Sequence, residues 1–216
     1  MQFPNAAKGI KKIFSSVILD IIGGVGLVIS ALVVLAVAAM LESGDESLEI
    51  TGMIAVITMA VSGVLTLLAA VLSVVGMAQA SKDEGSFKIA IFVLIAAVVT
   101  SVLSIILREH QIMYNIVLQI TDLLHLIVII YVIQGMINLA DALGEPGIIK
   151  SGKHLFIMIT IIYGLTCLAN IIVAIFGGQT ASLIAGVIAF LAEALGLVQS
   201  IVYIVFLSRA KKMLNR

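Results

Sequence analysis

Charged side chains are scarce in this chain. They make up 11% of the 216 residues, whereas apolar side chains make up 62%. Soluble domains usually carry about 25% charged residues. A soluble fold of this length could not bury so much apolar surface, so we expect lipid to cover it. The net charge is zero, so no excess of positive charge points to a nucleic-acid partner.

Tryptophan is absent and cysteine occurs once, as Cys167. A single cysteine excludes an intramolecular disulfide and makes no metal site, so we expect it to act as a small buried apolar side chain. The sequence contains no Ser-His-Asp or Cys-His arrangement and no metal-ligand spacing. The segments between its apolar runs are also too short to hold a catalytic domain. We therefore expect no enzyme activity, no metal and no cofactor.

The sequence does contain six apolar runs, each long enough for the roughly 20 residues that a helix needs to cross a bilayer. Short breaks rich in glycine, proline and charged residues separate the runs. The predicted fold is all-α, a polytopic membrane protein with one transmembrane helical domain over residues 1–216. The predicted helices span residues 13–41, 50–79, 87–107, 112–139, 155–176 and 181–207.

The basic residues predict how the helices thread the membrane. Of the twelve Lys and Arg residues, all but Arg108 lie on one side of the predicted bilayer. Cytoplasmic segments accumulate Lys and Arg, so we expect both termini in the cytoplasm and the chain in the plasma membrane. The residues on that side are Lys8, Lys11, Lys12, Lys82, Lys88, Lys150, Lys153, Arg209, Lys211, Lys212 and Arg216.

The first apolar run has an alternative interpretation. Its basic start and the later Ala36-Val37-Ala38 resemble a cleavable signal peptide, but the run is about twice as long as a signal core, which favours a retained helix. The preceding residues 1–14 carry Phe3 and Phe14 among lysines, and we expect this segment to lie in the membrane interface.

Glycine-containing motifs recur along the chain. Gly9, Gly85 and Gly152 precede the first, third and fifth helices, and Gly76-Met77 and Gly135-Met136 close the second and fourth. One interpretation is three parallel copies of a helical hairpin around an axis normal to the membrane, as found in some transporters. The other is a chance likeness among Lys-flanked helices. Mitochondrial carriers also consist of three hairpins, but their acidic Pro-containing motif is absent here.

Ionisable side chains within the predicted helices are costly in lipid and indicate function by default. At 1.5 Å per residue, Asp122 lies roughly 15 Å and Glu193 roughly 18 Å from the outer helix start, near the midplane. We expect both to bind an ion or proton, and His125 to relay or tune it. Asp20 is shallower, which favours a role in packing or helix-start electrostatics. In the alternative interpretation these groups are structural: Asp122 and His125 pair with each other, and a protonated Glu193 bonds to an asparagine such as Asn170.

Small residues predict which helix faces pack together, because they allow two backbones to approach closely. One such face on the sixth helix also carries Glu193, which is therefore expected to point into the bundle. The predicted packing residues are Gly23, Gly24, Gly186, Ala189 and Gly196.

Two classes of function remain open. The first is a small transporter or channel for protons, cations or a small solute, based on the intramembrane carboxylates. The second is a substrate-binding membrane subunit of a larger importer, or a scaffold or accessory protein. It would bind a membrane protein partner or a second copy of itself. The vitamin-capturing subunits of energy-coupling-factor systems are similar in size and helix count, but this chain has few aromatic residues to stack on a vitamin. The bilayer is the one partner common to both classes, and neither class needs nucleic acid.

Overall fold

The computed structural model describes residues 2–40, 46–176 and 178–215, and these residues form six α-helices and no β-strand. Each of the six is long and apolar enough to cross a membrane. This confirms the predicted all-α fold, and the six apolar helices are consistent with an integral membrane protein. The helices are α1 (Pro4–Met40), α2 (Glu46–Ala80), α3 (Ser86–Ile106), α4 (Gln111–Ala142), α5 (Pro146–Phe176) and α6 (Gly178–Leu214).

Three helices extend beyond the apolar runs that predicted them by seven residues or more. α1 begins at Pro4 and not at residue 13, α5 begins at Pro146 and not at residue 155, and α6 continues past residue 207 to Leu214. The extensions include basic residues, so run length alone misses them, but each has an apolar side that packs inward. Ala6 is 0% exposed and Leu214 is 4% exposed. From Pro4 onward the N-terminal segment is therefore continuous with α1.

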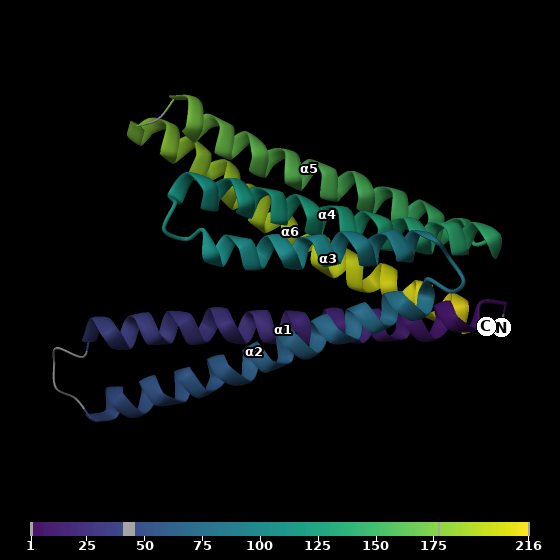
Figure 1. Cartoon of the computed structure of the whole chain (residues 1–216), viewed down its shortest axis with the longest axis horizontal. Coiled ribbons are helices and arrows are strands. Elements are labelled where there is room, and N and C mark those ends of the chain that lie inside the picture. Colours follow the sequence, from purple (N-terminus) through teal and green to yellow (C-terminus); the bar gives the residue numbers. More distant parts are fainter. Residues whose placement is uncertain (1, 41–45, 177, 216) are drawn as a thin grey trace.

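The described helices pair as three antiparallel hairpins, α1–α2, α3–α4 and α5–α6 (Figure 1). The hairpins meet at the end of the molecule where both termini lie, and they diverge toward the opposite end. We call the first the packed end, which comprises the starts of α1, α3 and α5 and the ends of α2, α4 and α6. We call the opposite end the open end.

The hydrophobic core lies at the packed end. Its fully buried large side chains come from all six helices, whereas Leu35, Met53 and Ile175 toward the open end are 66%, 66% and 68% exposed. Such exposure is expected where lipid covers the helices. The hairpins are thus joined mainly at one end. The core side chains include Ile10, Met77, Phe87, Ile133, Met136, Leu155, Phe206 and Leu207.

Within the first hairpin, buried small residues recur at every seventh position. This period keeps one face of each helix against its partner in a left-handed supercoil. A Cβ atom built on Gly9 would lie 2.7 Å from the backbone nitrogen of Ala80, so the two helices touch backbone to backbone. The buried series is Gly9, Ser16, Gly23, Ser30 and Val37 on α1, with Ala55, Ser62, Ala69 and Gly76 on α2.

A glycine also lies at the crossing of each of the other hairpins. In the second, a Cβ on Gly135 of α4 would lie 2.7 Å from the Phe87 ring of α3. In the third, a Cβ on Gly152 of α5 would lie 2.7 Å from the Ile137 side chain of α4 and 3.2 Å from the Phe206 ring of α6. The missing side chains thus leave room for the Phe87 ring at Gly135, and for Ile137 and the Phe206 ring at Gly152.

The α2–α3 loop ties α1 to the rest of the packed end through Asp83. One carboxylate oxygen accepts a hydrogen bond from the backbone N–H of Ala6 at 2.7 Å, and the other accepts one from the Asn5 side chain at 2.9 Å. Asp83 thus supplies the acceptor that the first turn of α1 needs. Burial raises the pKa of Asp83, but these hydrogen bonds outweigh it and hold the pKa below its usual value.

The adjacent Glu84 links α3 to α4. Its carboxylate accepts hydrogen bonds from the Ser86 N–H at 3.2 Å, the Ser86 hydroxyl at 2.9 Å and the Asn138 side chain at 3.0 Å. Burial raises the pKa of Glu84, and the hydrogen bonds from Asn138 and Ser86 outweigh that effect and lower it. Two neighbouring carboxylates therefore fasten three helices at the packed end.

Candidate functional site

Asp20 lies where all three hairpins come together. It lines a cavity of about 270 Å³, which we call the junction cavity, between α1, α2, α4 and α6. The cavity adjoins the core, whose residue Ile13 is part of its wall. Its polar lining residues are Asp20, Ser73, Gln199, Ser200 and Tyr203, and its apolar lining residues are Ile13, Val17, Ile21, Val128, Ile129 and Val132.

The junction cavity combines one carboxylate with neutral hydrogen-bonding groups. Ser73 of α2 and Ser200 and Tyr203 of α6 contribute hydroxyl groups, and Gln199 of α6 contributes an amide. The Ser200 hydroxyl donates to the backbone carbonyl of Gly196 at 3.0 Å, which leaves its oxygen lone pairs as acceptors. Among the described residues that line the cavity there is no basic side chain. The set can therefore coordinate a cation or exchange a proton.

A second cavity extends the surroundings of Asp20 toward α3. Its volume is about 230 Å³, and its lining residues include Asp20 and Ser73 together with Thr66 of α2 and Leu94 of α3. Asp20 and Ser73 line both cavities. Asp20 is thus reached from the space between the first and second hairpins as well as from the space between the first and third.

Asp122 lies in a separate groove between α4 and α5. The α4–α5 groove has a volume of about 490 Å³ and joins the second hairpin to the third. Asp122 is exposed, and no basic side chain is found among the described residues of the groove. The groove therefore places a carboxylate and several hydrogen-bonding groups beside the lipid. Its lining residues are Gln119, Asp122, Tyr163, Thr166, Cys167, Asn170 and Ile171.

The described side chains among the predicted ion-binding residues do not form one cluster. Asp20 and Asp122 line different cavities, and His125 is exposed on α4 and lines neither. Among the described side chains, Asp122 and His125 form no ion pair or hydrogen bond with each other. Glu193 lies in the sequence of α6, but its side chain is outside the described residues.

The predicted packing residues have different surroundings. A Cβ on Gly23 would lie 2.6 Å from the Thr66 hydroxyl of α2, so this glycine is in the seam of the first hairpin. A Cβ on Gly24, Gly186 or Gly196 would meet no atom beyond its own helix within 4 Å. Ala189 is half-buried.

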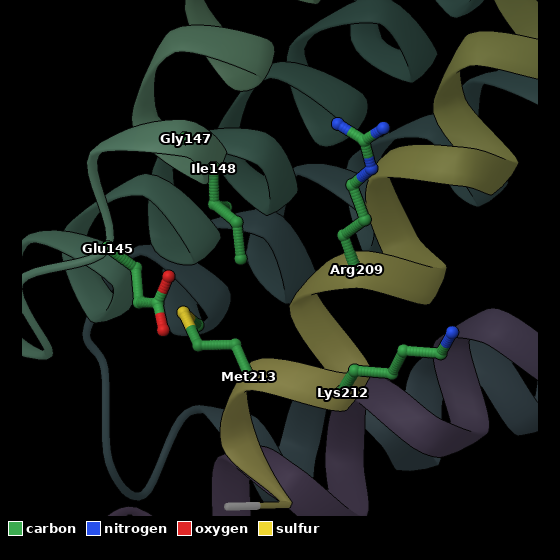
Figure 2. Close-up of a pocket in the computed structure, with 6 residues that line it drawn as sticks. All are labelled: Glu145, Gly147, Ile148, Arg209, Lys212 and Met213. Carbon is green, nitrogen blue, oxygen red and sulfur yellow. The ribbon is translucent and has the colours of Figure 1, made fainter.

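A further recess at the packed end lies between the start of α5 and the end of α6, with a volume of about 260 Å³ (Figure 2). Glu145 and Met213 extend toward its middle, whereas the charged groups of Arg209 and Lys212 point away from it. Charges of both signs border the recess and do not converge on one point. It is therefore a weaker candidate for a binding site than the junction cavity.

Sequence reasoning missed the α6 side of the junction cavity. Gln199 and Tyr203 are one helical turn apart, so both project from the same face of α6. This polar pair, one turn apart inside an apolar run, is the sequence signal that could have identified the α6 side of the cavity. Depth alone gave Asp20 a lesser role, because depth does not tell which neighbours a side chain meets.

No known protein family, no curated protein and no solved structure matches this chain. The geometry of its cavities is therefore the basis for assigning a function.

Proposed function

We propose that this protein is a small membrane transporter or channel for a proton, a cation or a small cationic solute, and that Asp20 is the residue that binds it. The observation that carries this proposal is the position of Asp20 in a cavity shared by three hairpins. Asp20 is exposed and lines this cavity, and a functional carboxylate in a membrane protein typically faces a cavity between helices.

The chemistry of the junction cavity favours a positive ligand. An unpaired carboxylate in a medium of low dielectric constant either takes up a proton or attracts a cation. The hydroxyl oxygens of Ser73 and Ser200 and the amide oxygen of Gln199 can replace part of the hydration shell of a cation. The Asp20 carboxylate would repel an anion, and no basic side chain among the described lining residues would attract one.

The arrangement of the hairpins suggests how a ligand reaches Asp20. The basic residues at the helix ends favour a cytoplasmic location for the packed end and for both termini, most simply in the plasma membrane. The ligand would then enter between the hairpins from the open, outer end, and the core at the packed end would close the pathway toward the cytoplasm.

The three hairpins are also consistent with an internal repeat. In each, a glycine lies in a close contact near the packed end: Gly9 against Gly76 in the first, Gly135 against Phe87 in the second, and Gly152 against Phe206, and more closely against Ile137 of α4, in the third. We infer a threefold repeat of a parallel hairpin, an organisation that places binding sites at the interface between repeats. Asp20 occupies such an interface.

The test is ion flux into proteoliposomes that contain the purified protein and an entrapped pH dye, with a sodium or potassium dye in parallel. Proton, sodium and potassium gradients are imposed in turn on the wild-type protein and on Asp20→Asn. We expect the wild type to conduct at least one of the three and Asp20→Asn to lose that flux.

Asp141→Asn is the matched control, because Asp141 is an exposed carboxylate at the packed end that lines none of the cavities described above. Correct folding of each variant is checked by its elution as a single species and by its helical circular dichroism. Flux that persists in Asp20→Asn would overturn the role of Asp20. A folded wild type that conducts none of the three ions, and binds none of them at equilibrium, would overturn the transport proposal.

The second candidate is an accessory or substrate-binding subunit that works within a larger membrane complex. The divergence of the hairpins toward the open end favours it, because a partner helix could occupy the space between them. Purification in a mild detergent from the native membrane distinguishes the two candidates. An accessory subunit would copurify with its partner and would carry no flux alone.

A further inference from the structure

We propose that the α4–α5 groove binds a lipophilic primary amine, a single alkyl chain with an ammonium head group, that enters sideways from the bilayer. This site is separate from the junction cavity and does not depend on the transport function. The inference starts from the contrast between the polar lining of the groove and its apolar surroundings.

The polar residues of the groove come from two different hairpins. Gln119 and Asp122 lie one turn apart on α4, and Tyr163, Thr166 and Asn170 lie on successive turns of α5. The Thr166 hydroxyl donates to the backbone carbonyl of Ile162 at 3.1 Å, which leaves its oxygen free to accept. Asp122, Gln119, Thr166 and Asn170 therefore offer a set of acceptors around one recess.

This arrangement is costly without a guest. Asp122, Gln119, Thr166 and Asn170 are exposed where lipid would cover the protein. Polar groups are expensive in hydrocarbon unless they are paired. An ammonium group removes most of this cost, because it supplies one positive charge for Asp122 and three N–H donors for the neighbouring acceptors.

The size and shape of the groove favour a small amphiphile over a protein helix. Its volume of about 490 Å³ is within the usual range for a bound small molecule, roughly 300–1,000 Å³. Helix–helix contacts in membranes use small residues, whereas this groove is lined by larger side chains such as Tyr163, Gln119 and Asn170. Ile171 continues the lining with apolar surface, against which an alkyl chain can lie.

Cys167 gives a direct measurement of occupancy, because it lines the groove and is the single cysteine of the chain. The protein is placed in lipid nanodiscs, and the rate of Cys167 alkylation by a membrane-permeant maleimide is measured with increasing dodecylamine. Dodecylamine is charged at pH 7, since its amine resembles that of lysine. We expect alkylation to slow about elevenfold at ten times the dissociation constant.

Asp122→Asn is the decisive variant, and Asp141→Asn is its matched control, because Asp141 is exposed and lines none of the cavities. Loss of a charge-assisted hydrogen bond should weaken protection in Asp122→Asn roughly ten- to a hundredfold. Protection in Asp141→Asn should match that of the wild type. Dodecanol, which has the same chain and no charge, should protect at least about tenfold less well than dodecylamine.

A second readout covers the case in which Cys167 reacts too slowly to follow. Radiolabelled dodecylamine retained by loaded nanodiscs is compared with that retained by empty nanodiscs of the same lipid. Equal retention, equal protection by dodecanol or unchanged binding in Asp122→Asn would each overturn the proposal. Concentration-dependent dimerisation with slower Cys167 alkylation and no amine binding would show that a second copy of the chain occupies the groove. Loss of flux in Asp20→Asn would bear on the junction cavity alone.

Discussion

The backbone contact between α1 and α2 at Gly9 is the feature of the packed end that tolerates least change. The hydrogen-bonded backbone of α2 faces Gly9: a Cβ there would meet the Gly76 carbonyl oxygen, and it would lie 2.9 Å from the Ala80 Cβ. Backbone atoms cannot rotate away as a flexible side chain can. Gly9→Ala must therefore push the two helices apart.

The size of the effect follows from two opposing contributions. Replacing glycine by alanine inside a helix stabilises it by about 1 kcal/mol. Inserting a methyl group into a packed contact typically costs about 1–3 kcal/mol. Gly24→Ala on the same helix gains the first contribution without the second, because a Cβ there meets nothing within 4 Å. We therefore expect Gly9→Ala to be about 1–3 kcal/mol less stable than Gly24→Ala.

The assay is unfolding in mixed micelles with an increasing mole fraction of sodium dodecyl sulfate, followed by circular dichroism. The free energy of unfolding of each variant is compared with that of the wild type. Both variants gain the same helix propensity, so this contribution cancels in the difference between them. Equal free energies of unfolding for Gly9→Ala and Gly24→Ala would refute the close crossing of α1 and α2. It would mean that the helices adjust their separation at little cost.

Two further predictions concern the packed end. Asp83→Ala should lower stability at pH 7 by about 1 kcal/mol, because the N–H of Ala6 loses its acceptor. The pKa of Asp83 is lowered from its usual 3.8, so the charged form favours the folded state. The stabilities of the wild type and the variant should therefore converge as the pH falls below 3.8, which unfolding curves between pH 7 and 3 would measure. Phe87→Ala should cost about 3–5 kcal/mol, because its ring is 0% exposed and fills the space over Gly135. Phe92→Ala, at a 63% exposed site on the same helix, is its control and should cost much less.

The apolar runs alone predicted the fold class and the existence of six helices, because the length of an apolar run directly measures whether a helix can cross a bilayer. They could not predict where the helices end. Lys8 and Lys12 precede the first apolar run and made the start of α1 look polar. Ala6, before Lys8, and Ile10, between the two lysines, are nevertheless buried. Hydropathy averages over all faces of a helix, whereas burial acts on one face.

The candidate site was harder to predict than the fold, because its residues come from helices far apart in the sequence. Depth along a helix favoured Asp122 over Asp20. The two differ in their neighbours, since Asp20 meets Ser73 and Gln199 in a cavity between hairpins and Asp122 faces a lateral groove. The hydrogen bonds that Asp83 accepts at the start of α1 could not be predicted either. The sequence of an acidic turn does not tell whether its carboxylate is solvated or caps a distant helix.

Under the proposed transport function, the uneven packing of the hairpins limits how an ion would leave toward the packed end. Separating the first hairpin there would expose Ile10, Ile13 and Met77, which are at most 2% exposed. At about 1.5–3 kcal/mol for each side chain, the cost would exceed roughly 4 kcal/mol. A state that is populated at a per cent or so lies only a few kcal/mol above the ground state. The opening must therefore be coupled to a gain elsewhere. The hairpins diverge at the open end, where their apolar faces can close on one another as the packed end opens. A rocking motion that exchanges burial between the two ends therefore meets this energetic requirement, whereas separation of the whole bundle does not.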